Sequence, residues 1–185
     1  MTALRGAVHP HADVLAGAAA TPDAVLDRLP GAALVHLACH AVSAESVDES
    51  RLELTTTLTV RRLLDRAGAT GGSTVVLSSC SSDLATCDHD EALTLATAFL
   101  AAGAVTAVAT RWPILDRAAP VVAFALHHFL TAGLPAAQAL RRTQLWLLDP
   151  ARAPLPGMPE TMRPRCRGAV LADPTVWAAF GHQGR

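Results

Sequence analysis

A histidine and a cysteine stand at the ends of two apolar segments of this sequence. His40 ends the segment 34–40, and Cys80 ends the segment 75–80. A short apolar run bounded by turn signals predicts a strand buried on both faces, as in the centre of a parallel sheet. Ligands of open α/β sheets bind beyond the carboxyl ends of the strands. If the two strands are neighbours, a thiol meets an imidazole at that edge, which is the minimal equipment for nucleophilic acyl transfer.

Helical patterns alternate with these strands. Thr21, Pro22 and Asp23 supply a cap, a first-turn proline and a first-turn acid for the helix that precedes the first strand. The order β-α-β favours parallel strands with right-handed crossovers, so we expect an α/β fold with a mostly parallel sheet. The other elements that we expect are helices over 60–67, 93–102, 116–131 and 135–148, a strand over 105–109, and a hairpin after the acid-rich loop 43–53.

The composition excludes several classes of protein. The chain has 185 residues, enough for one domain with a substantial core, and a formal net charge of −1. No basic stripe or series of stacking aromatics favours a nucleic-acid partner. The uncharged stretch 92–110 is long enough to raise the question of a membrane span, but Gly103 and its threonines divide it into a helix and a strand. The first residues lack the apolar core of a signal peptide, so we expect a cytoplasmic protein with free cysteines and no membrane contact.

Several motifs occur in a specific order along the chain. They are His40 after an apolar strand, Cys80 after Leu77-Ser78-Ser79, the helix 91–102 closed by Gly103-Ala104, Arg111-Trp112-Pro113 with Asp116, and the closing residues 177–180. This ordered set resembles the CHAT family of caspase-like (clan CD) cysteine peptidases. The match runs from about residue 18 to residue 180, and the resemblance implies one domain over 1–185. The implied fold is a three-layer α/β/α sandwich with a mostly parallel sheet, shortened at the N-terminus.

The resemblance implies a peptidase that needs no cofactor and no metal. Cys80 would attack the scissile carbonyl and His40 would protonate the leaving amine. Backbone N–H groups of Ala41 and Cys80 would hold the oxyanion. The substrate would be a protein or peptide, and a separate regulatory or helical-repeat protein could be a partner. Residues implied in the substrate cleft are Ser78, Thr110, Arg111 and Trp112.

Three features depart from the family pattern. Ala41 stands where the family usually has glycine, and positive φ there would cost alanine about 1 kcal/mol. Relatives that cleave after Arg or Lys tend to carry an acid close before the cysteine, whereas Ser78 and Ser79 are neutral, which disfavours a basic P1 residue. The first strand and helix are compressed into residues 1–17, with 13–16 as a strand remnant, and losing an edge strand exposes a sheet edge. The alternative function is therefore a catalytically inactive caspase-like module that binds peptides or partner proteins.

Other residues with reactive side chains have structural interpretations. Strand alternation turns Cys39 away from the face of His40, so we expect it to pack in the core. We expect His36 to be a hydrogen-bonded structural residue and His127 and His128 to lie on a partly exposed helix face. Cys80, Cys87 and His89 could instead bind zinc, but they offer one close ligand pair where structural sites usually show two.

Overall fold

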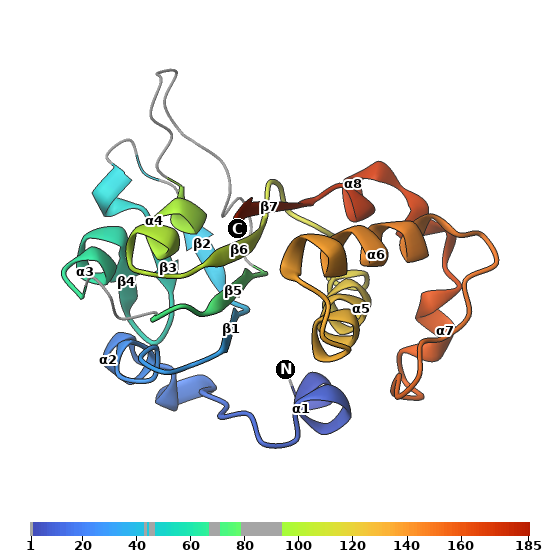
Figure 1. Ribbon diagram of the computed structural model, residues 1–185, viewed down its shortest axis with the longest axis horizontal. Helices are drawn as coiled ribbons and strands as arrows, with labels where there is room; N and C mark the ends of the chain where they lie inside the picture. Colours follow the sequence, from blue (N-terminus) through green and yellow to red (C-terminus); the bar gives the residue numbers. More distant parts are fainter. Residues whose placement is uncertain (1, 43, 45–46, 67–70, 79–93) are drawn as a thin grey trace. The chain divides into compact units, whose positions relative to one another are not determined.

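The chain folds into two compact units. The computed structural model describes residues 2–42, 44, 47–66, 71–78 and 94–185 (Figure 1). Unit 1 consists of Met1–Val14 and Ile114–Phe180, and unit 2 consists of Leu15–Pro113 and Gly181–Arg185. A single domain over residues 1–185 stays a prediction.

Unit 2 is built on a four-stranded sheet with the order β1-β5-β6-β7. β1 (Leu34–Leu37), β5 (Thr74–Leu77) and β6 (Thr106–Thr110) are parallel, and β7 spans Phe180–Gly184. The apolar side chains of β5 are fully buried on both faces of the sheet, as expected for a central parallel strand. The prediction of a mixed α/β fold with a mostly parallel sheet is confirmed.

A second, antiparallel sheet contains the predicted histidine. It has the order β2-β3-β4, formed by His40–Val42, Arg51–Glu53 and Thr57–Thr59. The predicted single strand 34–40 was therefore wrong, because the chain bends at Cys39 between β1 and β2. The bend lets β2 pair with β3 while Leu52 and Leu58, on the inner face, are buried.

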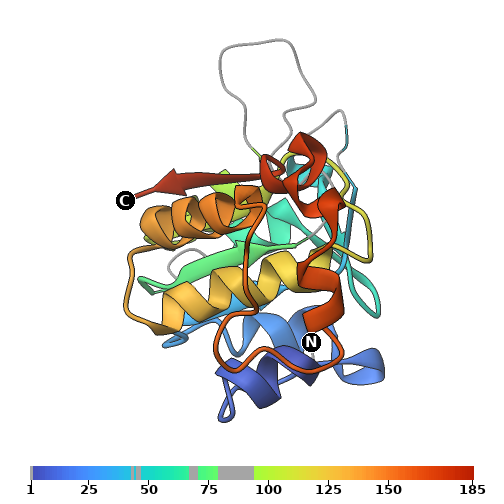
Figure 2. The same ribbon diagram turned by 90° about the vertical axis from the view of Figure 1, so that its right-hand side faces the viewer.

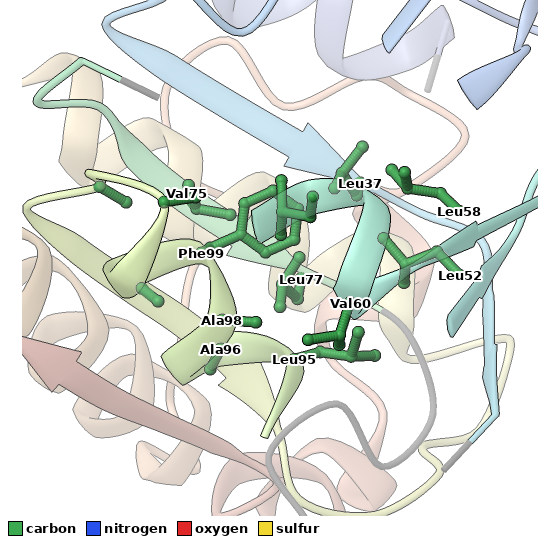
Figure 3. Packing of buried hydrophobic residues seen from close by; sticks show 14 of the residues in the cluster. Leu37, Leu52, Leu58, Val60, Val75, Leu77, Leu95, Ala96, Ala98 and Phe99 are labelled. Carbon is green, nitrogen blue, oxygen red and sulfur yellow. The ribbon is translucent and has the colours of Figure 1, made fainter. Parts of the chain in front are cut away.

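Three helices of unit 2 each begin at a threonine. The Thr21, Thr59 and Thr94 hydroxyls accept hydrogen bonds from first-turn N–H groups of α2 (Pro22–Leu26), α3 (Val60–Leu64) and α4 (Leu95–Ala101). These helices bury their apolar side chains with one face of the sheet in a single cluster. Phe99 is fully buried in it, and Figure 3 shows this residue together with Val75 and Leu77 of β5. The cluster fixes how β5 and β6 lie against α4. Two 3-10 helices, η1 (Gly17–Ala19) and η2 (Val47–Glu49), complete the elements of unit 2.

The predicted strand remnant at residues 13–16 was wrong. These residues belong to no helix or strand, and the N-terminal segment instead contains α1 (Thr2–Val8). Leu4 of α1 is buried, so the segment contributes a helix face rather than a strand. Among the described residues, β1 is thus an edge of the sheet.

Unit 1 is helical. α5 (Ala119–Thr131) and α6 (Ala136–Leu148) lie side by side, joined by a turn at Gly133 with φ of 86° (Figure 2). The expected exposure of His127 was wrong, because it is 2% exposed and its Nδ1 lies 2.8 Å from Nε2 of His9, within hydrogen-bonding distance. No helix among the described residues is long and apolar enough to cross a membrane. The remaining elements are α7 (Arg163–Cys166), η3 (Ala169–Ala172) and α8 (Pro174–Trp177).

A buried arginine organises the proline-rich segment that follows α6. The Arg152 guanidinium donates to the carbonyl oxygens of Leu147 at 2.7 Å, Asp149 at 2.9 Å and Cys166 at 2.5 Å, and also to that of Gly168. Arg152 is only 6% exposed, so these carbonyls replace the water that would otherwise solvate it. One side chain thereby ties the end of α6 to the end of α7.

Arg152→Met tests this tie. Methionine keeps much of the buried volume but leaves the carbonyls without a donor, so we expect the free energy of unfolding to fall by about 3 kcal/mol. Urea unfolding followed by circular dichroism measures it. Arg167→Met, at an exposed position, is the matched control. Equal urea midpoints for the two variants would contradict the assignment.

Candidate active site

The two strands that precede His40 and Cys80 are neighbours. β1 pairs in parallel with β5, and the last registered pair is Leu37 with Leu77. The Ser78 N–H extends the ladder by donating to the Leu37 carbonyl oxygen at 2.9 Å. β1 and β5 therefore end at the same edge of the sheet, and His40 and Cys80 each follow the last registered pair by three residues in the sequence. Cys80 itself lies outside the described residues.

His40 opens strand β2 and is exposed. Its direct partner across the β2–β3 ladder is Glu53. Among the described residues, the His40 imidazole makes no hydrogen bond and no ion pair. The ring is therefore accessible to a ligand at this edge, and Glu53 is the acidic side chain that the ladder places opposite it.

Ala41, predicted as an oxyanion donor, lies in the middle of β2. It pairs with Leu52 and packs, partly buried, against the apolar cluster of unit 2. Strand backbone is extended, a conformation that alanine adopts without strain. The positive φ that would have disfavoured alanine at this position is thus not required here. The second predicted donor, the Cys80 N–H, lies outside the described residues.

The Ser78 side chain is hydrogen-bonded to His36. The Ser78 Oγ lies 2.8 Å from Nε2 of His36 on the neighbouring strand. Both side chains are half-buried. The prediction that His36 is a hydrogen-bonded structural residue is confirmed, and the pair fixes the end of β5 two residues before Cys80.

The third strand end at this edge is that of β6. Leu77 pairs with Ala109, so Thr110, the last residue of β6, lies level with Ser78 after β5. Thr110 is only 2% exposed, whereas Arg111 is exposed and Trp112 is half-buried. Two of the three residues predicted here thus present side-chain surface beside the ends of β1 and β5.

Two other cysteines have environments that suppress reactivity. Cys39 packs against the apolar cluster, as predicted; its burial and, secondarily, the charge of Glu53 raise the pKa of its thiol to about 11. Cys166 is fully buried in unit 1, and its Sγ donates to the Arg163 carbonyl oxygen at 3.0 Å. Neither thiol has the electropositive, accessible surroundings of a nucleophile.

Glu53 was missed by the sequence interpretation, which placed it in an exposed loop. It ends β3 and turns out to be the cross-strand partner of His40. The alternation Arg-Leu-Glu, a short turn and then Thr-Leu-Thr was the available signal, because it is typical of a half-buried hairpin. The pattern does not predict which residue of β2 pairs with Glu53, because that register depends on how β2 and β3 come together in the folded chain.

The alternative zinc ligands Cys80, Cys87 and His89 all lie within residues 79–93, outside the described residues. In the part of the chain that the structure describes, no group of three or more His, Cys, Asp or Glu side chains could hold a metal ion.

Comparison with protein families gives a match over residues 1–185 to the family model described as CHAT domain. No curated protein matches the chain.

Cys39 and Cys166 should resist alkylation in the native protein. A pKa of about 11 instead of 9.0 lowers the thiolate fraction of Cys39 at neutral pH about a hundredfold, and Cys166 is fully buried. We expect iodoacetamide at pH 7.5 to label both at least tenfold more slowly in the native protein than in urea. Peptide mapping by mass spectrometry gives the rates. Native labelling of Cys39 as fast as in urea would show that its environment has been misassigned.

Proposed function

The chain belongs to the CHAT domain family, which is caspase-like, and we propose from this premise that it is a cysteine endopeptidase acting through Cys80 and His40. The observation that supports the proposal is the parallel pairing of β1 with β5. Their register ends at Leu37 and Leu77, three residues before each member of the dyad. Neighbouring strands that end at the same level bring the segments carrying a nucleophile and its base to the same edge of the sheet.

In the proposed reaction, the Cys80 thiolate attacks the carbonyl carbon of the scissile peptide bond and forms a C–S bond. The C–N bond then breaks, and His40 gives its proton to the leaving amine. Water adds to the thioester while His40 takes one of its protons. The C–S bond breaks, and the carboxylic acid and the free thiol are restored. The exposure of His40 at the strand end is compatible with this exchange of protons with both amine and water.

The oxyanion of each tetrahedral intermediate would be held by the backbone N–H groups of Ala41 and Cys80. Preorganised donors of this kind lower the barrier by about 3 kcal/mol each. Because the backbone of Ala41 is extended, alanine can replace the usual glycine at this donor position without strain. Its pairing with Leu52 in the β2–β3 ladder supports the rigidity that such a donor needs.

The substrate is proposed to lie as an extended peptide along the ends of β1, β5 and β6. Arg111 and Trp112 offer side-chain surface, whereas Thr110, being buried, would contribute backbone groups. Ser78 is held by His36 and carries no charge, so we expect a small or apolar P1 residue rather than a basic one.

The broader setting belongs to the same proposal. The fold would be a three-layer α/β/α sandwich of the caspase type, in a cytoplasmic protein. A separate regulatory or helical-repeat protein would present the protein substrate or activate the site. Neither a cofactor nor a metal enters the proposed reaction.

An inactive peptide-binding module is the second candidate, favoured by the position of β1 at an edge of the sheet among the described residues, where an extended peptide could pair. It predicts peptide binding that survives Cys80→Ala and no turnover by the unmodified chain. The peptidase predicts turnover, and a covalent adduct that Cys80→Ala abolishes.

Labelling with a panel of peptidyl acyloxymethyl ketones separates these candidates. We expect a single adduct on Cys80, with a rate that depends on the peptide and falls about a hundredfold or more in His40→Ala, because the imidazole no longer activates the thiol. Intact mass and peptide mapping identify the site. Cys39→Ser is the matched control for thiol loss outside the dyad.

Absence of labelling, or equal labelling of all four cysteines, would contradict a competent site in the isolated chain. Peptide titration of Cys80→Ala by calorimetry would then test the binding module directly.

A further inference from the structure

Glu53 and His40 form a directly opposed pair in the antiparallel β2–β3 ladder. Side chains of directly opposed residues lie on the same face of a sheet, with Cβ atoms about 4.5–5.5 Å apart. A glutamate is long enough to bring a carboxylate oxygen to an imidazole nitrogen across that spacing. The pairing is fixed by the backbone register and does not depend on a mobile loop.

The face on which the pair lies is the outer face of the small sheet. Ala41, Leu52 and Leu58 turn inwards, where Leu52 and Leu58 are 1% and 2% exposed. Strand alternation therefore turns His40 and Glu53 outwards together. Consistently, His40 is exposed and the Glu53 side chain is 36% exposed.

Arg51 holds the Glu53 carboxylate in place from two residues earlier on the same strand face. Its Nε donates to Oε1 of Glu53 at 2.9 Å, and the two side chains are 35% and 36% exposed. This contact uses one carboxylate oxygen. The second, Oε2, has no hydrogen-bond partner among the described residues.

The charge of Glu53 acts on the immediate surroundings of His40. It is the second cause, after burial, of the raised pKa of the adjacent Cys39 thiol. The Glu53 side chain thus lies close to the bend from which His40 emerges. No side chain of the described residues makes a hydrogen bond or ion pair with the His40 ring, and Glu53 is the acidic residue that the ladder places opposite it.

We propose that Glu53 is the positioning residue of His40: its Oε2 accepts a hydrogen bond from one imidazole nitrogen and so directs the other nitrogen towards the thiol edge. The part concerning the thiol rests on the proposed function. Glu53 remains a carboxylate throughout and takes no proton; it favours one tautomer and stabilises the imidazolium that forms after proton transfer. Catalytic hydrogen bonds of this kind often tighten only when substrate is bound.

The state of the His40 ring tests the proposal without reference to activity. Ring ¹⁵N chemical shifts of the full chain report which nitrogen carries the proton, and His40→Gln assigns the resonances among the eight histidines. We expect one tautomer of neutral His40 to dominate in the unmodified protein and both to be populated in Glu53→Gln. Glu53→Asp retains the charge with a shorter reach and should give an intermediate population.

Glu49→Gln is the matched control, because it removes one exposed acid of the same loop region without touching the ladder. It should leave the His40 ring shifts unchanged. Identical shifts in Glu53→Gln and the unmodified protein would overturn the proposal, as would an equal change in Glu49→Gln. Thermal melting confirms that each variant is folded.

Steady-state kinetics test whether Glu53 contributes to the proposed peptidase activity. With a peptide substrate selected by the labelling panel, Glu53→Gln should lower kcat about tenfold with less than a twofold change in KM, because it disturbs proton transfer and not peptide binding. Equal kcat values would overturn the functional part of the proposal. If the unmodified chain neither turns over peptide nor labels at Cys80, the peptidase function fails, and the ring measurement still decides the role of Glu53.

Discussion

The parallel pairing of β1 with β5 is the constraint on which the rest of the site depends. Because Leu37 is registered with Leu77, β1 and β5 end at the same level of the sheet. A slip of one residue would turn the side chains of a strand to the opposite face. The fully buried apolar side chains of β5 oppose such a slip, since it would carry β5 out of a packed core.

In and beside the small antiparallel sheet, residues that pack in the core alternate with polar residues that face solvent. At the bend after β1, Cys39 turns into the apolar cluster and becomes a poor nucleophile, while His40 turns outwards to solvent. The same alternation buries Leu52 and exposes Glu53. The buried side chains of Leu52 and Leu58 therefore hold the small sheet in place, and its outer face carries His40 and Glu53.

Much of the framework could be predicted from the sequence because it is encoded locally. The threonine cap and first-turn proline located the start of α2, and the predicted helices 93–102 and 135–148 agree with α4 and α6 to within two residues. The β-α-β order favoured parallel strands, but the pairing of β1 with β5 became known only from the structure. By contrast, the break between β1 and β2 and the partner of His40 arise from the pairing of β2 with β3, which no local pattern specifies. The burial of His127 against His9 arises from a contact 118 residues apart in the chain.

The most direct measurement of the central claim is a disulfide cross-link between positions 40 and 80. In a Cys39→Ser background, His40→Cys is oxidised and the disulfides are mapped by mass spectrometry, beside Val42→Cys two residues further along β2. A disulfide requires Cα atoms about 4.4–6.8 Å apart, a range that includes the spacing of neighbouring strands. We expect rapid bonding between positions 40 and 80, with little from position 42. No bond from position 40, or equal bonding from both positions, would contradict the account.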